Sequence, residues 1–179
     1  MRFNIFYRAV LLLGVLLGST LPLRAQKGTE YEVKALYVVL LLKYMSFSDN
    51  AKTFNIGVIG DNPFNGHLKK YIGQTINGRE IKINFYGKNV NQAAQANCHF
   101  YFVAGSELLK QKAIIQKVSK PNNMVLGDNK WFLNAGGMIN LQFDKNSVSW
   151  GANKKIMDQK KIKVDFQVYQ LSNNKGKVE

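Results

Sequence analysis

Apolar residues recur along the chain with spacings that predict strands and helices in alternation. Three short apolar runs that end close to a glycine are typical of buried strands. These runs are Phe54–Ile59, Cys98–Val103 and Met124–Leu126. Glu80–Tyr86 alternates apolar and polar residues, so it predicts a strand with one solvent-facing side. Because helical spacing fills the gaps between the runs, the pattern predicts an α/β fold with mostly parallel strands.

The first predicted helix is the most apolar one. It runs from Val33 to about Phe47, after a capping box that begins at Thr29. No charged residue occurs from Ala35 to Leu42, so this helix is either fully buried or leaves one side bare for a partner. The other predicted helices are Pro63–Ile72, Asn89–Ala96, a segment capped by Ser106 that ends at Val118, Lys154–Lys160 and Asp165–Ser172.

Residues 136–153 predict a β-hairpin at the C-terminal end. Apolar and polar residues alternate from Met138 to Phe143, residues 144–146 have turn chemistry, and Ser147–Trp150 returns as a second strand. Gly136 and Gly137 indicate a tight backbone entry to the first strand. The expected architecture is therefore a single α/β domain with a mixed, mostly parallel sheet flanked by helices and a C-terminal β-hairpin.

The N-terminus has the order of a secretory signal peptide. Two arginines precede an apolar run from Ala9 to Leu17, and the small residue Ala25 precedes Gln26. The run is shorter than the ~20 apolar residues that a spanning helix needs, so an uncleaved anchor is the weaker alternative. We expect a signal peptide at 1–25, the domain at 26–172, a flexible tail at 173–179, and a soluble exported protein.

Charge and cysteine content change this picture little. A net charge of +14 would suggest nucleic acid in a cytosolic protein. Export and the scattered lysines favour a solvated basic surface instead, and no nucleic-acid partner is expected. Cys98 is the only cysteine, so no intramolecular disulfide can form. Its place in an apolar strand predicts burial rather than a bridge to another chain.

The chain carries few residues that indicate catalysis. His67 and His99 are the only histidines, so no His-rich metal site can be built. Cys98 and His99 are adjacent on a strand and point to opposite faces, so they cannot act as a nucleophile–base pair. Phosphate-binding loops, the dinucleotide glycine pattern and the nucleophile elbow are absent from the sequence. We therefore expect a protein that is not an enzyme and uses no cofactor or metal.

Three predicted strands end in a similar way. Asp61, Ser106 and Asp128 each follow a glycine at the end of a strand. In a parallel sheet these ends share one edge, where ligands bind in many α/β folds. The three residues therefore form a candidate ligand crevice, and its two acids favour a cationic or zwitterionic ligand. Ordinary strand-to-helix turns are the alternative interpretation.

Several segments resemble the YfiR/HmsC-type periplasmic regulators. The C-terminal hairpin carries the motif residues Gly136, Gly137 and Asn140, followed by Asn153 before a helix. Residues 34–47 resemble the opening helix of these regulators, although the Trp-Pro that commonly ends that helix is Phe47-Ser48 here. The turn at residues 60–64 adds to the resemblance, which extends from about residue 34 to 172.

The resemblance implies a non-catalytic periplasmic protein, often dimeric. It would bind and repress the periplasmic sensor region of an inner-membrane signalling protein, typically a diguanylate cyclase that controls c-di-GMP and biofilm formation. Related domains also suggest a sensor histidine kinase as partner. Some relatives carry disulfides, which a chain with one cysteine cannot reproduce. A periplasmic small-ligand binder that uses the crevice is the alternative function.

Aromatic and apolar residues of the first helix and the hairpin are the expected partner contacts, because interface anchors are enriched in aromatic side chains. The candidates are Tyr37, Leu41, Tyr44, Phe47 and Trp150. Replacing Tyr44 and Phe47 by alanine should weaken binding without unfolding the domain. Loss of folding would instead place them in the core.

Overall fold

The structure is a computed structural model that describes residues 22–105, 107–144 and 147–165. A seven-stranded sheet has the order β3-β4-β2-β5-β6-β7-β8. Its strands are β2 (Thr53–Ile59), β3 (Thr75–Ile76), β4 (Arg79–Gly87), β5 (Phe100–Val103), β6 (Met124–Gly127), β7 (Ile139–Asp144) and β8 (Ser147–Ala152). The five inner strands are parallel, and β3 and β8 run antiparallel to their neighbours. The predicted α/β fold with a mixed, mostly parallel sheet and a C-terminal hairpin is confirmed.

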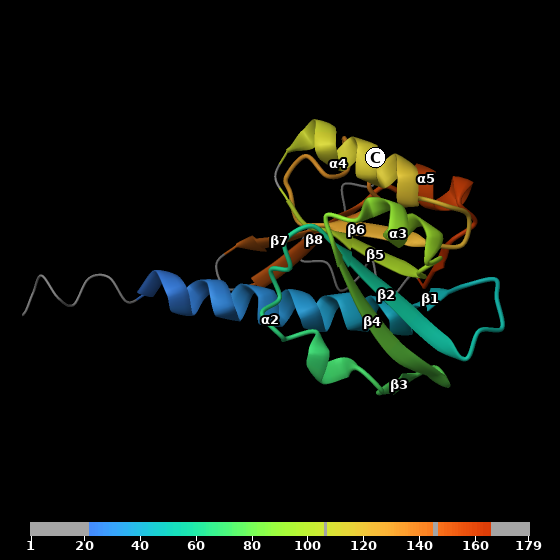
Figure 1. Cartoon of the computed structure of the whole chain (residues 1–179), viewed down its shortest axis with the longest axis horizontal. Coiled ribbons are helices and arrows are strands. Elements are labelled where there is room, and N and C mark those ends of the chain that lie inside the picture. Colours follow the sequence, from blue (N-terminus) through green and yellow to red (C-terminus); the bar gives the residue numbers. More distant parts are fainter. Residues whose placement is uncertain (1–21, 106, 145–146, 166–179) are drawn as a thin grey trace, which may run out of the picture.

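Helices cover both faces of the sheet (Figure 1). The long α2 (Pro22–Lys43) lies along one face, and α3 (Val90–Gln95) and α4 (Leu108–Val118) lie on the other. The short α5 (Lys154–Gln159) follows the hairpin. Among the described residues, none of the helices combines the length and the apolar character that crossing a membrane requires.

The ends of α2 differ from those of the predicted helix. The helix begins at Pro22, so Thr29 lies inside it and is not its N-cap. It ends at Lys43 and not at Phe47, because the next residues form β1 (Met45–Ser46), which pairs antiparallel with β9 (Lys163–Val164). This pairing joins segments that are far apart in the sequence, so no local pattern indicated it.

The predicted helix Pro63–Ile72 is wrong. Phe64 and Leu68 are both fully buried and are four residues apart, as on one face of a helix. Between them, Asn65 and Gly66 have φ values of 45° and 91°, which a right-handed helix does not allow. The segment is therefore a series of turns, and only the one-turn 3-10 helix η1 (Lys69–Tyr71) remains.

The shorter helices agree with the prediction where the structure describes them. Asn89 caps α3 by accepting a hydrogen bond from the backbone N–H of Gln92, and Asn153 caps α5 in the same way. Ser106, the predicted cap of α4, lies outside the described residues. The predicted helix at residues 165–172 also lies outside them, apart from Asp165.

The side chains of β5 alternate between the two faces of the sheet. Phe102 points towards α2 and packs edge-on against Phe64, with 4.7 Å between the ring centroids. Tyr101 points the other way and donates a 2.5 Å hydrogen bond to the carbonyl of Ala93 in α3.

Cys98 is buried, as predicted, and burial raises the pKa of its thiol. The single thiol is therefore held away from solvent in its less reactive, protonated form.

Candidate functional site

A cleft of about 630 Å³ opens where β2, β4 and β5 end. The strand ends form one wall, and residues of α3 and α4 form the other. The chain leaves β2 on the α2 side, where Phe64 packs, and leaves β5 on the opposite side to enter α4. Adjacent strands whose connections leave on opposite faces create a crevice at their carboxyl ends, the usual ligand position in α/β sheets. The fold therefore provides a ligand-sized cleft at this edge.

The predicted crevice is present only in part. Asp61 and Gly105 line the cleft, as expected from the strand ends. Asp128 is not among the lining residues, because its carboxylate turns towards α2. Ser106 lies outside the described residues. Lys88, Glu107, Lys110 and Gln111, which the sequence analysis did not select, contribute the other polar side chains.

Asp128 instead joins β6 to α2 through a partly buried ion pair. Lys34 of α2, only 2% exposed, lies 3.0 Å from the Asp128 carboxylate and 2.5 Å from Glu30. The Tyr31 hydroxyl donates a 2.8 Å hydrogen bond to Asp128. Burial and the adjacent carboxylate both raise the pKa of Tyr31, so this hydroxyl remains a donor. Asp128 therefore anchors a helix and is not available to a ligand.

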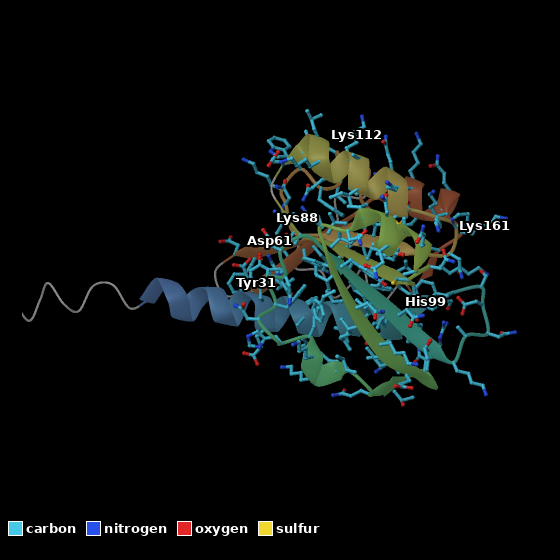
Figure 2. All side chains as sticks on the ribbon, in the orientation of Figure 1. Tyr31, Asp61, Lys88, His99, Lys112 and Lys161 are labelled. Carbon is cyan, nitrogen blue, oxygen red and sulfur yellow. The ribbon has the colours of Figure 1, made fainter. Side chains whose placement is uncertain are left out.

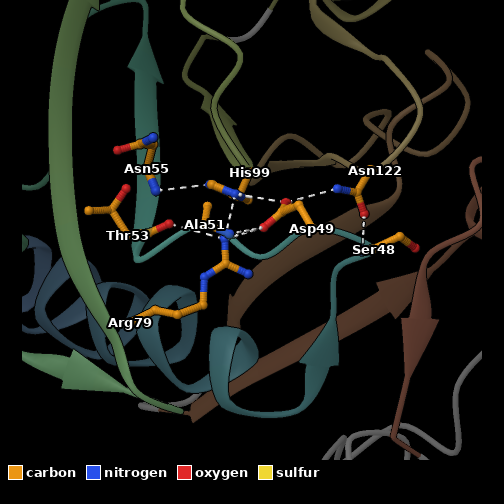
Figure 3. A network of polar contacts seen from close by, with 8 residues as sticks. All are labelled: Ser48, Asp49, Ala51, Thr53, Asn55, Arg79, His99 and Asn122. Carbon is orange, nitrogen blue, oxygen red and sulfur yellow. Dashed lines mark hydrogen bonds and ion pairs between the residues drawn. The ribbon is translucent and has the colours of Figure 1, made fainter.

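A second polar cluster lies at the opposite ends of the strands (Figure 3). Asp49 is its centre and accepts hydrogen bonds from Arg79 at 2.7 Å and from Asn122 at 2.9 Å. The Nε2 atom of His99 lies 3.1 Å from Oδ2 of the same carboxylate. Sequence analysis missed this cluster because its members come from four separated segments. The cluster joins these segments through hydrogen bonds and ion pairs.

The contacts of His99 favour its neutral ring. Its Nδ1 accepts a hydrogen bond from the backbone N–H of Asn55 and therefore carries no proton. Its Nε2 lies 3.1 Å from the Asp49 carboxylate and 2.7 Å from the Arg79 guanidinium. Burial and the nearby Arg79 guanidinium lower the pKa of His99, against the opposing effect of Asp49. Burial alone would raise the pKa of Asp49, but the Ala51 N–H, His99 and Arg79 hold it below its usual value.

The expected partner contacts divide into core and surface residues. Leu41 and Trp150 are each 4% exposed and belong to the core, so the structure corrects their assignment to the surface. Phe47 packs edge-on against Phe54 and Phe100 and is a core contact as well. Tyr37 on α2 and Tyr44, which directly follows α2, are half-buried and remain accessible. Of the two residues chosen for alanine replacement, Phe47 is thus expected to affect folding.

The motif residues of the hairpin have structural roles. Gly137 and Gly127 leave space for the Phe132 ring, because a Cβ atom at either position would lie within 2.4 Å of that ring. Gly136 has a φ of 96°, which favours glycine. Asn140 is 3% exposed. Asn153 is the N-cap of α5, so the two glycines and this asparagine meet local packing and backbone requirements.

Comparison with solved structures supports the fold. A conserved domain protein from Vibrio cholerae O1 biovar El Tor matches with a TM-score of 0.55 and 15% identity, over 78% of this chain and 58% of that chain. An ABC domain in complex with L-Trp from Streptococcus pneumoniae matches with a TM-score of 0.51 and 12% identity, over 78% and 59%. This chain thus spans less than two thirds of either protein, and the likeness concerns the fold alone.

Comparison at the level of the sequence identifies the family. No curated protein matches this chain. The family model described as YfiR/HmsC-like matches residues 31–173, which include α2 from residue 31 onwards, the whole seven-stranded sheet and the hairpin motif. The predicted resemblance is confirmed, and the chain belongs to the YfiR/HmsC-like family.

Proposed function

We propose that this protein is a non-catalytic periplasmic regulator that binds the sensor region of an inner-membrane signalling protein and represses it. The observation that carries the proposal is the family match over residues 31–173. The family is one of periplasmic regulators of c-di-GMP signalling, which favours a diguanylate cyclase as the partner. A sensor histidine kinase is the second partner class that the proposal admits.

The surface that fits such a partner best is one side of α2. Its apolar residues there follow the three- and four-residue spacing of a helix face. They are Val33, Leu36, Tyr37 and Leu40 of α2 and Tyr44, the residue after its end, which together we call the α2 stripe. Leu36 is 49% exposed and the other four are half-buried. Apolar side chains that a helix leaves partly accessible in this way are suited to packing against an apolar face of another protein.

Regulation by such contact requires unequal affinity for two states of the partner. A protein that bound both states equally would shift nothing, however tightly it bound. We therefore propose that the α2 stripe binds the inactive conformation of the sensor region more tightly than the active one. Signalling would then rise when the regulator is lost or when its binding surface is damaged.

Capture of the membrane partner tests this proposal. Tagged protein recovered from the periplasm is mixed with detergent-solubilised membranes of its own cell, and bound proteins are identified by mass spectrometry. We expect capture of a diguanylate cyclase or histidine kinase with a periplasmic segment. Leu36→Glu should lower its recovery at least about tenfold, because it places a charge in an apolar contact.

Leu109→Glu is the matched control, because Leu109 is 80% exposed on α4, on the other side of the sheet. This variant should capture as much partner as the wild type. If both variants lose the partner equally, the α2 stripe is not its binding surface. If folded wild-type protein captures no signalling protein, the proposal of a regulator is contradicted.

A further inference from the structure

We propose that the cleft at the ends of β2, β4 and β5 binds a small zwitterion through Asp61, Lys88 and Gln111. A zwitterion here means a molecule that carries both an ammonium and a carboxylate group, as a free amino acid does. The inference goes beyond the proposed function, since it concerns a soluble ligand and a different face of the molecule from the α2 stripe.

Gln111 is the buried polar group that points to a ligand. It lines the cleft and is 1% exposed. Its Nε2 donates a 2.5 Å hydrogen bond to the carbonyl of Gly105, which fixes the orientation of the amide. Its Oε1 is buried and has no hydrogen-bond partner within the part of the chain that the structure describes. Buried acceptors are rarely left unpaired, so the cleft presents an acceptor to a donor that comes from outside.

The rim of the cleft offers one carboxylate and one ammonium group without internal partners. Asp61 and Lys88 are exposed, lie at the same end of the sheet (Figure 2) and pair with no charged side chain among the described residues. The neighbouring Lys110, in contrast, forms a 2.7 Å ion pair with Glu107. The cleft can therefore bind one charge of each sign.

Other features that line the cleft favour the same two charges on a ligand. α4 begins at Leu108, and Glu107, its N-cap, forms no side-chain cap bond. The N-terminus of this helix and Lys88 both favour a carboxylate. Asp61 and the Gln111 Oε1 both accept hydrogen bonds, which favours an ammonium with N–H donors. Val90 and Ile114 provide apolar surface for the carbon skeleton.

Isothermal titration with single amino acids tests the inference. The protein is recovered from the periplasm after expression of the full chain, and each common α-amino acid is titrated into it. We expect at least one to bind. Asp61→Asn and Lys88→Gln should each weaken that binding about tenfold or more, because each removes a charged hydrogen-bond partner. Lys112→Gln is the matched control, since Lys112 is exposed on α4 but does not line the cleft.

Analogues of the amino acid that binds complete the test. The amine without the carboxylate, the acid without the ammonium, and the N-trimethylated form without N–H donors should all fail to bind. Gln111→Leu should also abolish binding, provided that circular dichroism shows that this variant folds. If it does not fold, the variants Asp61→Asn and Lys88→Gln decide the test. The inference is overturned if no amino acid binds, if a singly charged analogue binds equally well, or if Asp61→Asn and Lys88→Gln retain full affinity.

Discussion

At the scale of single residues, the Asp49 cluster shows how buried polar groups are satisfied by segments distant in sequence. Asn122 connects the cluster to the chain after α2, since its Oδ1 accepts a 2.6 Å hydrogen bond from the Ser48 N–H. His99 receives the Asn55 N–H on Nδ1 and faces Asp49 through Nε2. A second proton on His99 would displace the Asn55 donor and add a positive charge beside Arg79. The neutral ring is thus the state that the fold stabilises.

This environment predicts a pH-dependent stability. The folded state lowers the pKa of His99, so below the unfolded value of 6.5 the unfolded chain takes up a proton that the folded chain resists. The free energy of unfolding should therefore fall as the pH decreases below 6.5, by at most about 1.4 kcal/mol per pH unit for this one group. The contribution of Asp49 is lost only at lower pH, below 3.8.

Urea unfolding at a series of pH values measures the effect. His99→Gln should reduce the dependence between about pH 7 and pH 5, because the titrating group is gone. His67→Gln provides the control, since His67 lies outside the cluster and is the only other histidine. If His67→Gln removes the dependence and His99→Gln does not, the assignment to the Asp49 cluster is wrong.

At the scale of elements, α2 is held to the sheet by packing and by the ion pair between Lys34 and Asp128, which we call the clamp. Ala35, Val38 and Leu42 are fully buried along its inner face. Near its N-terminal half, Lys34 binds Asp128 at the end of β6. The clamp fixes the rotation of the helix against the sheet, and with it the direction in which the α2 stripe faces.

Removing one partner of the clamp should be costly. Lys34→Met leaves the Asp128 carboxylate, whose side chain is 11% exposed, with the Tyr31 hydroxyl as its remaining clamp partner. We expect the free energy of unfolding to fall by about 3 kcal/mol in urea titrations. Lys70→Met is the matched control, because the Lys70–Glu32 pair is 47% and 53% exposed and should contribute less than about 1 kcal/mol. Similar losses in the two variants would contradict a special role for the clamp.

At the scale of the whole molecule, the sheet separates two candidate surfaces. The α2 stripe lies on one face, and the cleft opens between the strand ends and the helices of the other face. A partner protein and a small ligand could therefore bind at the same time without steric conflict. Binding of either one in the periplasm requires that the protein is exported. Export in turn requires that the first 25 residues act as a signal peptide.

Export predicts a defined mature chain. Intact-mass measurement of the protein from a periplasmic fraction should correspond to a chain that starts at Gln26. The reason is the small residue Ala25 after the apolar run, the position at which signal peptidase cleaves. Recovery of the full-length mass from membranes would support the uncleaved anchor instead and would change how the α2 stripe is presented to a partner.

The sequence by itself determined the type of most elements and the family. Apolar runs bounded by glycine specify strands locally, and the strands at residues 53–59, 100–103 and 124–127 lie where the pattern predicts. Caps such as Asn89 and Asn153 also act within one turn, so they can be recognised without the fold. The hairpin is local for the same reason, and the antiparallel pairing of β7 with β8 confirms it.

Only the tertiary structure decided which residues meet. The end of α2 depends on the pairing of β1 with β9. The turns after Pro63 depend on the backbone conformations of Asn65 and Gly66, which the spacing of apolar residues does not indicate. Asp61 and Asp128 look equivalent in the sequence, yet one lines a cleft and the other binds Lys34. Burial and charge pairing are properties of the packed chain, so the exposure of Leu36 and the core position of Trp150 emerge only when the helix and sheet are in contact.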